Sequence, residues 1–241
     1  MENSIFQRHE LKYLVTETQR ARLEEAFESC MVPDPHGEST ICNVYYDTPD
    51  FRLIRASLEK PIYKEKLRLR SYGCAAPEDT VFLELKKKYK GIVYKRRVSV
   101  PCRAAEDYFA GRAPLPDCGQ IGREIDYFKR FYGSLYPAVY LCYDRTAYYA
   151  RESTDLRVTF DRNIAWRQQA VRLTAPTGGR QILAPGWSLM EVKAADAIPL
   201  WLAEWISAQG IRQSSFSKYG EAYKTILAET RREMLGGIVN V

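Results

Sequence analysis

The stretch Lys66-Leu67-Arg68-Leu69-Arg70 alternates a basic residue with a leucine at every position. Successive side chains of a β-strand point to opposite faces, so the pattern places all three cations on one face and both leucines on the other. It therefore predicts a strand, over residues 64–72, with one charged and one apolar face.

The same alternation recurs in strand after strand along the chain. The charged positions are Arg8, Glu10 and Lys12, then Glu84, Lys86 and Lys88, then Lys95 and Arg97, and later Arg145, Arg157, Glu191 and Lys193. A one-sided antiparallel sheet with its charges in solvent would give this pattern in any single strand. Solvent faces usually mix in Thr, Ser and Gln, however, whereas these are nearly all Arg, Lys and Glu. The composition favours a sheet closed on itself, with the charges lining its lumen.

The remaining segments predict further strands and helices joined by short turns. Strands are predicted at 6–15, 41–47, 64–72, 81–88, 92–100, 138–150, 156–161 and 188–193, and helices at 16–30, 51–58, 121–132, 199–206 and 218–229. The first helix opens at Thr16 with Gln19 at the capping-box position, and the helix after Pro199 is expected to hold Leu202, Trp205 and Ile206 on its apolar stripe. We therefore expect an α+β fold: a closed eight-stranded antiparallel β-barrel, or tunnel, with helices packed outside. Residues 1–241 are expected to form this single domain.

Composition narrows the classes of partner and compartment. The 241 residues carry a net charge of +6, which favours an anionic partner. Six dispersed cysteines without a C-x-x-C motif and only two histidines argue against a zinc site, so any metal should be a hard cation held by carboxylates. We find no signal peptide and no apolar run long enough to span a membrane, so the expected compartment is the cytoplasm.

The charged face itself indicates which anion is bound. A lumen lined by so many cations would repel itself unless a polyanion filled it, and the planar fork of Arg can grip two phosphate oxygens at once. Glu10, Glu84 and Glu191 would weaken a plain nucleic-acid groove. They favour Mg²⁺ or Mn²⁺ held between carboxylates and phosphate oxygens. Each glutamate could instead form a salt bridge with a neighbouring Lys or Arg.

An ordered set of motifs resembles a known family. The motifs are Arg8-x-Glu10-x-Lys12, Lys66-Leu67-Arg68-Leu69-Arg70, Glu84-Leu85-Lys86, Tyr143-Asp144-Arg145, the Arg157 to Asp161 strand, Leu189-Met190-Glu191-Val192-Lys193 and Ser217-Lys218-Tyr219. Together they resemble the catalytic domain of the vacuolar transporter chaperone type, a polyphosphate polymerase of the triphosphate tunnel metalloenzyme superfamily. The resemblance runs from Phe6 to about Tyr223. Superfamily members that hydrolyse triphosphates open with Glu-x-Glu-x-Lys, and Arg8 in place of the first Glu favours the polymerase branch.

The resemblance implies roles for individual residues. Phosphate binding is implied for Lys12, Arg68, Arg70, Lys86, Lys95 and Arg145, and the charge pattern adds Arg8 and Lys193. A catalytic role is implied for Lys218. Arg157, which the resemblance also places among the phosphate-binding residues, is assigned to catalysis with it. Glu191 is the implied ligand of Mn²⁺ or Mg²⁺, with Glu84 and Glu10 added as metal ligands from the charge pattern.

The expected activity is phosphoryl transfer from ATP to polyphosphate, with ATP or another triphosphate and polyphosphate as partners and no nucleic acid. Three alternatives remain open at this point. The chain could be a triphosphatase, if water accepts the phosphoryl group, or a non-catalytic polyphosphate-binding module. The basic pI near 8.9 and the 17 tyrosines would also suit a nucleic-acid binder, although tyrosines more often pack as part of the core and its rim.

Overall fold

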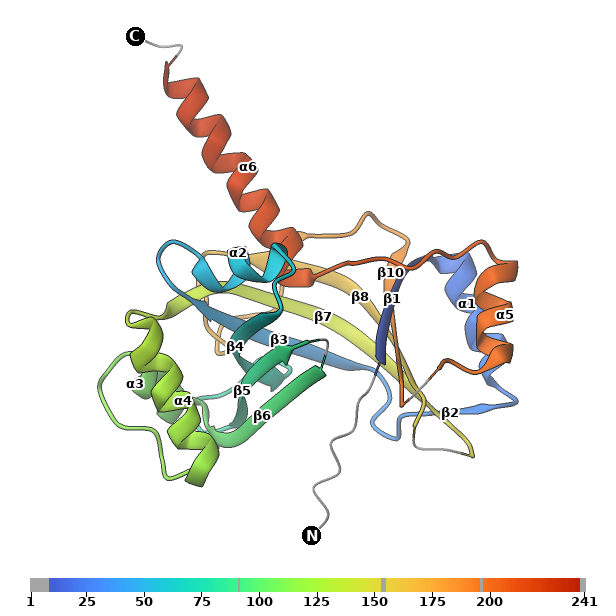
Figure 1. Ribbon diagram of the computed structural model, residues 1–241, viewed down its shortest axis with the longest axis horizontal. Helices are drawn as coiled ribbons and strands as arrows, with labels where there is room; N and C mark the ends of the chain where they lie inside the picture. The colour runs from blue at the N-terminus through green and yellow to red at the C-terminus, as the bar shows by residue number, and fades with distance from the viewer. Residues whose placement is uncertain (1–8, 91, 153–154, 196, 239–241) are drawn as a thin grey trace.

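The structure, a computed structural model, describes residues 9–90, 92–152, 155–195 and 197–238 (Figure 1). Its strands are β1 (His9–Thr16), β2 (Met31–Pro33), β3 (Ser39–Asp47), β4 (Tyr63–Tyr72), β5 (Thr80–Tyr89), β6 (Ile92–Pro101), β7 (Tyr136–Ala150), β8 (Arg157–Arg167), β9 (Arg180–Gln181) and β10 (Trp187–Ala194). Its helices are α1 (Glu17–Phe27), α2 (Arg52–Leu58), α3 (Cys102–Phe109), α4 (Gly119–Tyr132), α5 (Leu200–Ala208) and α6 (Lys218–Ile238).

The strands form one antiparallel sheet. Eight of them follow the order β1-β10-β8-β7-β3-β4-β5-β6, while β2 pairs with β7 and β9 with β8. The α+β class and the eight expected strands are therefore confirmed. The sheet curls until β5 and β1 come close to each other. The evidence is the distance of 3.6 Å between Lys86 Nζ and Glu10 Oε2. Backbone pairing between β6 and β1 is not observed within the described residues, so closure of the barrel stays a prediction.

Helices cover the outer, apolar face of the sheet at two places, as Figure 1 shows. Leucines and valines of β4, β5 and β6 pack under α3 and α4, with Tyr108 and Phe128 in the same core. The outer faces of β1, β8 and β10 pack against α1 and α5, where Phe27 and Leu202 are buried. The predicted capping box of Thr16 and Gln19 opens α1. Trp205 of α5, expected on the apolar stripe, is 42% exposed instead.

Two helices depart from the prediction that all helices pack outside the barrel. The inner face, defined as the face that carries Arg68, is not charged along its whole length. Ile41, Leu141 and other apolar side chains occupy one part of it, and they pack against α2 and the first turns of α6. The apolar side chains of the inner face also need to be shielded from water. The first turns of α6 cover them, and the helix then runs outward from the sheet (Figure 1).

Four further differences have local causes. The short strands β2 and β9 and the helix α3 were not predicted, since two or three residues carry too little pattern and Cys102–Phe109 follows directly on a strand. β8 continues to Arg167, six residues beyond its predicted end. Asn163 there adopts a left-handed φ of 50°, a conformation typical of turns, although the strand continues through it. No helix of the described chain has the length and apolar character needed to cross a membrane.

Candidate functional site

Strand register brings the charged side chains of β4, β5 and β6 together on the inner face. Directly opposite residues of an antiparallel pair share a face. Arg68 lies opposite Glu84, and Glu84 lies opposite Arg97 on the next strand. Three strands that are separated by turns in the sequence therefore contribute to a single group of charges.

This group, the Glu84 cluster, consists of Glu84, Arg68, Arg70, Lys95 and Arg97. Glu84 is 1% exposed. Its Oε2 accepts from Arg68 Nε at 2.8 Å, and its Oε1 lies 2.7 Å from Lys95 Nζ and 3.3 Å from Arg97 Nε. Burial alone would raise the pKa of Glu84, but Arg68, Arg70 and Lys95 outweigh it and lower the pKa to about 2. One carboxylate thus serves four cations, which leaves a strong positive excess for an anion.

A second group, the Glu191 cluster, contains Glu191, Asp161, Lys218, Arg145 and Lys12. Lys218 Nζ donates to Glu191 Oε1 at 2.9 Å and also pairs with Asp161. Arg145 donates to both oxygens of Asp161, at 2.6 and 2.7 Å, and to Glu191 Oε2 at 3.2 Å. Lys12 Nζ lies 3.6 Å from Glu191 Oε1. Although burial would raise the pKa of Glu191, Lys218 and Arg145 hold it well below its usual value.

Two tyrosines join the clusters. Tyr143 accepts a hydrogen bond from Arg70 at 3.2 Å, and the Lys218 ammonium lies 4.6 Å from the centre of the same ring. Tyr45 accepts from Arg68 at 3.1 Å and stacks on Tyr219, the residue after Lys218. The two sets of cations therefore line one continuous surface, with phenol rings between them.

Lysines bridge the remaining gap between β1 and β5. Lys66 lies opposite Lys86, and its Nζ donates to Ser217 Oγ at 3.3 Å. No carboxylate among the described residues forms an ion pair with Lys66, unlike Lys12 and Lys86, which both pair with Glu10. Burial, followed by the charges of Lys86 and Lys12, lowers the pKa of Lys66 to about 7. A bound anion would favour the protonated ammonium of Lys66, so this side chain is suited to contact phosphate.

Most of the predicted site residues are gathered here. Arg68, Arg70, Lys95, Lys12, Arg145, Glu191 and Lys218 lie in the two clusters, Lys86 and Glu10 lie beside them, and Lys193 faces Glu10 in the register of β10 and β1. Arg157 is on the same face but four residues along β8 from Asp161, where it lies 3.7 Å from Asp34. It is therefore set apart from Lys218. Arg8 lies outside the described residues.

Sequence reasoning missed Asp161 and Lys66 as site residues. Asp161 is fully buried and contacts both Lys218 and Arg145. Its signal was present, because Arg157, Thr159 and Asp161 occupy alternate positions of one strand. Lys66 belongs to the alternating stretch itself, but only the structure shows that it has no carboxylate partner there.

The three predicted metal ligands are not collected at one point. In the described part of the chain, no group of three or more His, Cys, Asp or Glu is arranged to hold a metal. Glu84 lies among its four cations, whereas Glu191 and Asp161 share Lys218 and Arg145. Mg²⁺ commonly takes one or two carboxylates and completes its shell with phosphate oxygens and water. The pair Glu191 and Asp161 fits that requirement, and the metal roles of Glu84 and Glu10 stay predictions.

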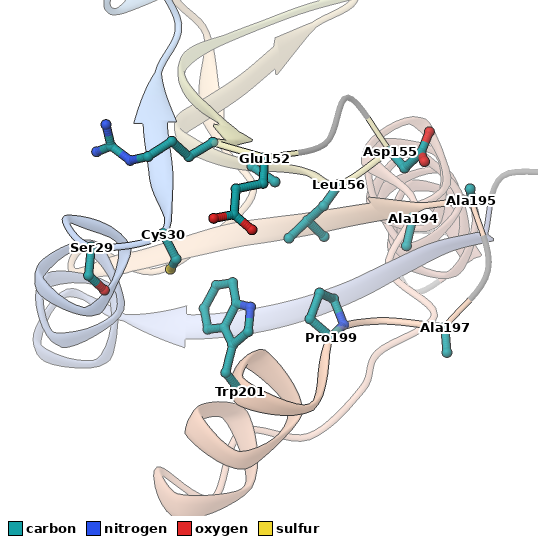
Figure 2. Close-up of a pocket in the computed structure, with 12 residues that line it drawn as sticks. Ser29, Cys30, Glu152, Asp155, Leu156, Ala194, Ala195, Ala197, Pro199 and Trp201 are labelled. Atoms are coloured by element: carbon teal, nitrogen blue, oxygen red, sulfur yellow. The ribbon is translucent and has the colours of Figure 1, made fainter.

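A cavity of about 470 Å³ lies elsewhere, between the start of α5 and the residues that follow β7 and precede β8 (Figure 2). Trp201 and Pro199 face Leu156 across it, with Cys30 and Glu152 alongside. None of the described residues assigned to phosphate or metal lines it. The charged inner face, and not this cavity, is therefore the candidate site.

Comparison with known proteins gives a family match and similar folds. The family model described as the VTC domain matches residues 7–227. The structure is similar to that of a candidate adenylate cyclase from Bacillus halodurans, at 14% identity and a TM-score of 0.54, covering 88% of this chain and 95% of that one. This likeness shows that the two proteins share a fold.

Two weaker likenesses complete the comparison. A candidate adenylate cyclase from Vibrio parahaemolyticus has 13% identity and a TM-score of 0.46, with 92% of this chain and 97% of that one covered. The Mimivirus capping enzyme triphosphatase has 10% identity and a TM-score of 0.34, with 82% and 86% covered. A search among curated proteins gave no match.

Proposed function

The chain belongs to the VTC domain family of the triphosphate tunnel superfamily, and from this premise we propose that it is a metal-dependent polyphosphate polymerase that uses ATP. Membership implies phosphoryl chemistry on triphosphates or polyphosphate. The observation that carries the finer proposal is the continuous cationic surface from the Glu84 cluster to the Glu191 cluster. In this proposal the Glu84 cluster holds one phosphate chain and the Glu191 cluster lies where phosphoryl transfer to a second chain takes place.

In this proposal one set of residues binds the phosphates and another neutralises the charge that moves during phosphoryl transfer. Such transfer needs little covalent chemistry from a protein and much positioning of charge. Arg68, Arg70 and Lys95 bind the phosphates of one chain. Lys218 and Arg145, held by the buried Asp161, neutralise charge on the phosphoryl group as it moves. A bound Mg²⁺ or Mn²⁺ would be held by Glu191 and Asp161 and would supply further neutralisation of phosphate oxygens.

We expect the purified protein to lengthen polyphosphate when it is incubated with ATP and Mn²⁺. Gel electrophoresis of the product and an assay for released phosphate, performed on the same samples, measure polymer and hydrolysis together. Omission of the metal should abolish the polymer. Release of phosphate with no polymer under any divalent metal would contradict the polymerase and assign a triphosphatase. Tight binding of polyphosphate without either product would leave only a binding module.

Binding of tripolyphosphate should weaken as the pH rises through neutrality. In the free protein the pKa of Lys66 is about 7 and that of Lys193 about 8, each lowered first by burial. A bound polyanion favours the protonated ammonium, so binding takes up protons and is strongest below pH 7. From pH 6 to pH 8 we expect a loss of about tenfold in affinity through Lys66, as proton linkage requires.

The variant Lys66→Arg provides the control for this pH dependence, because arginine keeps its charge across the range. Calorimetry in two buffers of different ionisation enthalpy gives the number of protons taken up by each protein. The ligand's own protonation is common to both proteins and cancels in the difference. Equal proton uptake by the wild type and Lys66→Arg would contradict the assignment.

A further inference from the structure

The cationic stripe of β4 ends in an aromatic residue. Lys66, Arg68 and Arg70 are followed at the next inward position by Tyr72, which is 57% exposed. Phe82 lies directly opposite Arg70 on β5, and its ring meets that of Tyr72 edge to face, with centroids 5.8 Å apart. A large exposed ring therefore adjoins the arginines that are assigned to phosphate.

Arg97 of the Glu84 cluster extends over the same aromatic pair. Its guanidinium carbon lies 3.5 Å from the centre of the Phe82 ring, a stacked cation–π arrangement. Its Nη2 is shielded from solvent and donates to no acceptor within the described chain. One strong donor beside the rings thus lacks an acceptor within the described chain.

A second aromatic and arginine pair lies at the same end of the inner face. Arg157 lies 4.9 Å from the centre of the Tyr149 ring, and Tyr149 donates to Asp34 at 3.1 Å. Tyr72 lies opposite Ile41, and Ile41 lies opposite Tyr143, six residues before Tyr149 on β7. Because β4 and β7 are both antiparallel to β3, they run in the same direction, and both aromatic pairs lie towards the same end of the sheet. The opposite ends of the β4 and β5 stripes carry Lys64 and Lys88 instead.

We propose that this end, the Tyr72 mouth, formed by Tyr72, Phe82, Arg97, Tyr149 and Arg157, is a stacking site for the base of a nucleoside triphosphate. The base lies on Tyr72, and the phosphates extend along β4 over Arg70 and Arg68 towards Lys218. The free donor of Arg97 faces the ribose or the first phosphate. The inference rests on the proposed function, and it adds the orientation of the substrate: the base at Tyr72 and the polymer leaving past Lys64 and Lys88.

Stacking also determines how selective the site is. Every nucleobase presents an aromatic face, so recognition by stacking tolerates any base, with the larger purines favoured over pyrimidines. We expect GTP to bind about as well as ATP, and both to bind more tightly than UTP. A strict preference for adenine would instead need hydrogen bonds to the base edge.

The test compares ATP with tripolyphosphate, which has the phosphates but no base. Metal-free calorimetry is run on the full chain as wild type, Tyr72→Ala, Tyr72→Phe and Tyr89→Ala, the last an exposed tyrosine (44%) on the outer side of β5. Tyr72→Ala should weaken ATP binding by about tenfold, in the range of one lost stacking contact. It should leave tripolyphosphate binding unchanged. Tyr72→Phe and Tyr89→Ala should bind both ligands like the wild type.

The possible outcomes distinguish a failure of the stacking site from a failure of the proposed function. Retained tripolyphosphate binding reports that Tyr72→Ala is folded. An equal effect of Tyr72→Ala on both ligands, or an effect on neither, would overturn the stacking site and leave the proposed function standing. Failure of the wild type to bind tripolyphosphate at all would overturn both.

Discussion

Turnover of ATP should fall by about 10²-fold or more in Glu191→Gln, the size of effect seen when one charge-stabilising group is removed from an active site. Glu191 is 6% exposed and lies between Lys218 and Arg145. Glutamine keeps the shape of the side chain and removes one negative charge, so the carboxylate pair that fits Mn²⁺ is lost. Binding of tripolyphosphate without metal should survive or tighten, since Lys218 and Arg145 then have one fewer internal partner.

Two measurements on Glu191→Gln separate a metal ligand from a structural salt bridge. Activity is titrated with Mn²⁺, and metal-free binding of tripolyphosphate is followed by calorimetry. Glu221→Gln, which changes a partly exposed glutamate on α6 that pairs with Lys224, is the matched control. If Glu191 were only a salt-bridge partner, its variant would lose stability but retain its metal requirement. Near-normal turnover with an unaltered metal requirement would end the assignment.

The variant Lys218→Met should lose both activity and stability. Lys218 is 9% exposed and pairs with two buried carboxylates, Glu191 and Asp161. Breaking a buried ion pair by removing one partner costs about 3–5 kcal/mol of unfolding free energy, because a charge is left without compensation. Turnover should fall by roughly 10²–10³-fold as well, since charge on the moving phosphoryl group loses its nearest ammonium.

Urea unfolding of four proteins checks the origin of that loss. Lys224→Met, which removes an exposed lysine of the same helix, should stay within about 0.5 kcal/mol of the wild type. The double variant Lys218→Met with Glu191→Gln should recover part of the stability, because it removes one unpaired carboxylate. Lys218 holds the pKa of Glu191 low, so this stabilisation is present above the usual carboxylate pKa and is lost on acidification. A Lys218→Met protein as stable as the wild type at neutral pH would contradict the pairing.

The sequence predicted the faces of the strands better than the contacts between them. Alternation of charge is a local property, so Arg68, Glu84 and Glu191 were correctly placed on one face from their neighbours alone. Which cation meets which carboxylate depends on strand order and register, and β1 pairs with β10, which begins 171 residues after β1 ends. The separation of Glu84 from Glu191 could not be deduced without that topology.

Local exceptions to periodicity explain the remaining differences. Leu141 and Ile41 face into what was predicted to be a charged lumen, because α6 supplies this part of the face with an apolar partner. Lys66 and Asp161 were both inside quoted motifs, yet their roles depend on α6, whose first residue is Lys218. Because α6 begins at the inner face, it adds contacts to Lys66 and Asp161 that cannot be predicted from the strand pattern alone.

The buried Glu84 has a further consequence for how salt should act on this protein. Held among four cations, Glu84 is a counter-ion fixed to the backbone, so the inner face resembles an ion exchanger that has one anion of its own attached. A polyphosphate bound as proposed would displace this fixed anion from some of its partners, and one fewer mobile anion would need to leave than from a face with no internal carboxylate. The entropy of ion release then comes from cations shed by the polymer. In the proposed polymerase, Glu84 would neutralise part of this positive charge again when the product leaves, which would favour release of a chain that is otherwise held too tightly.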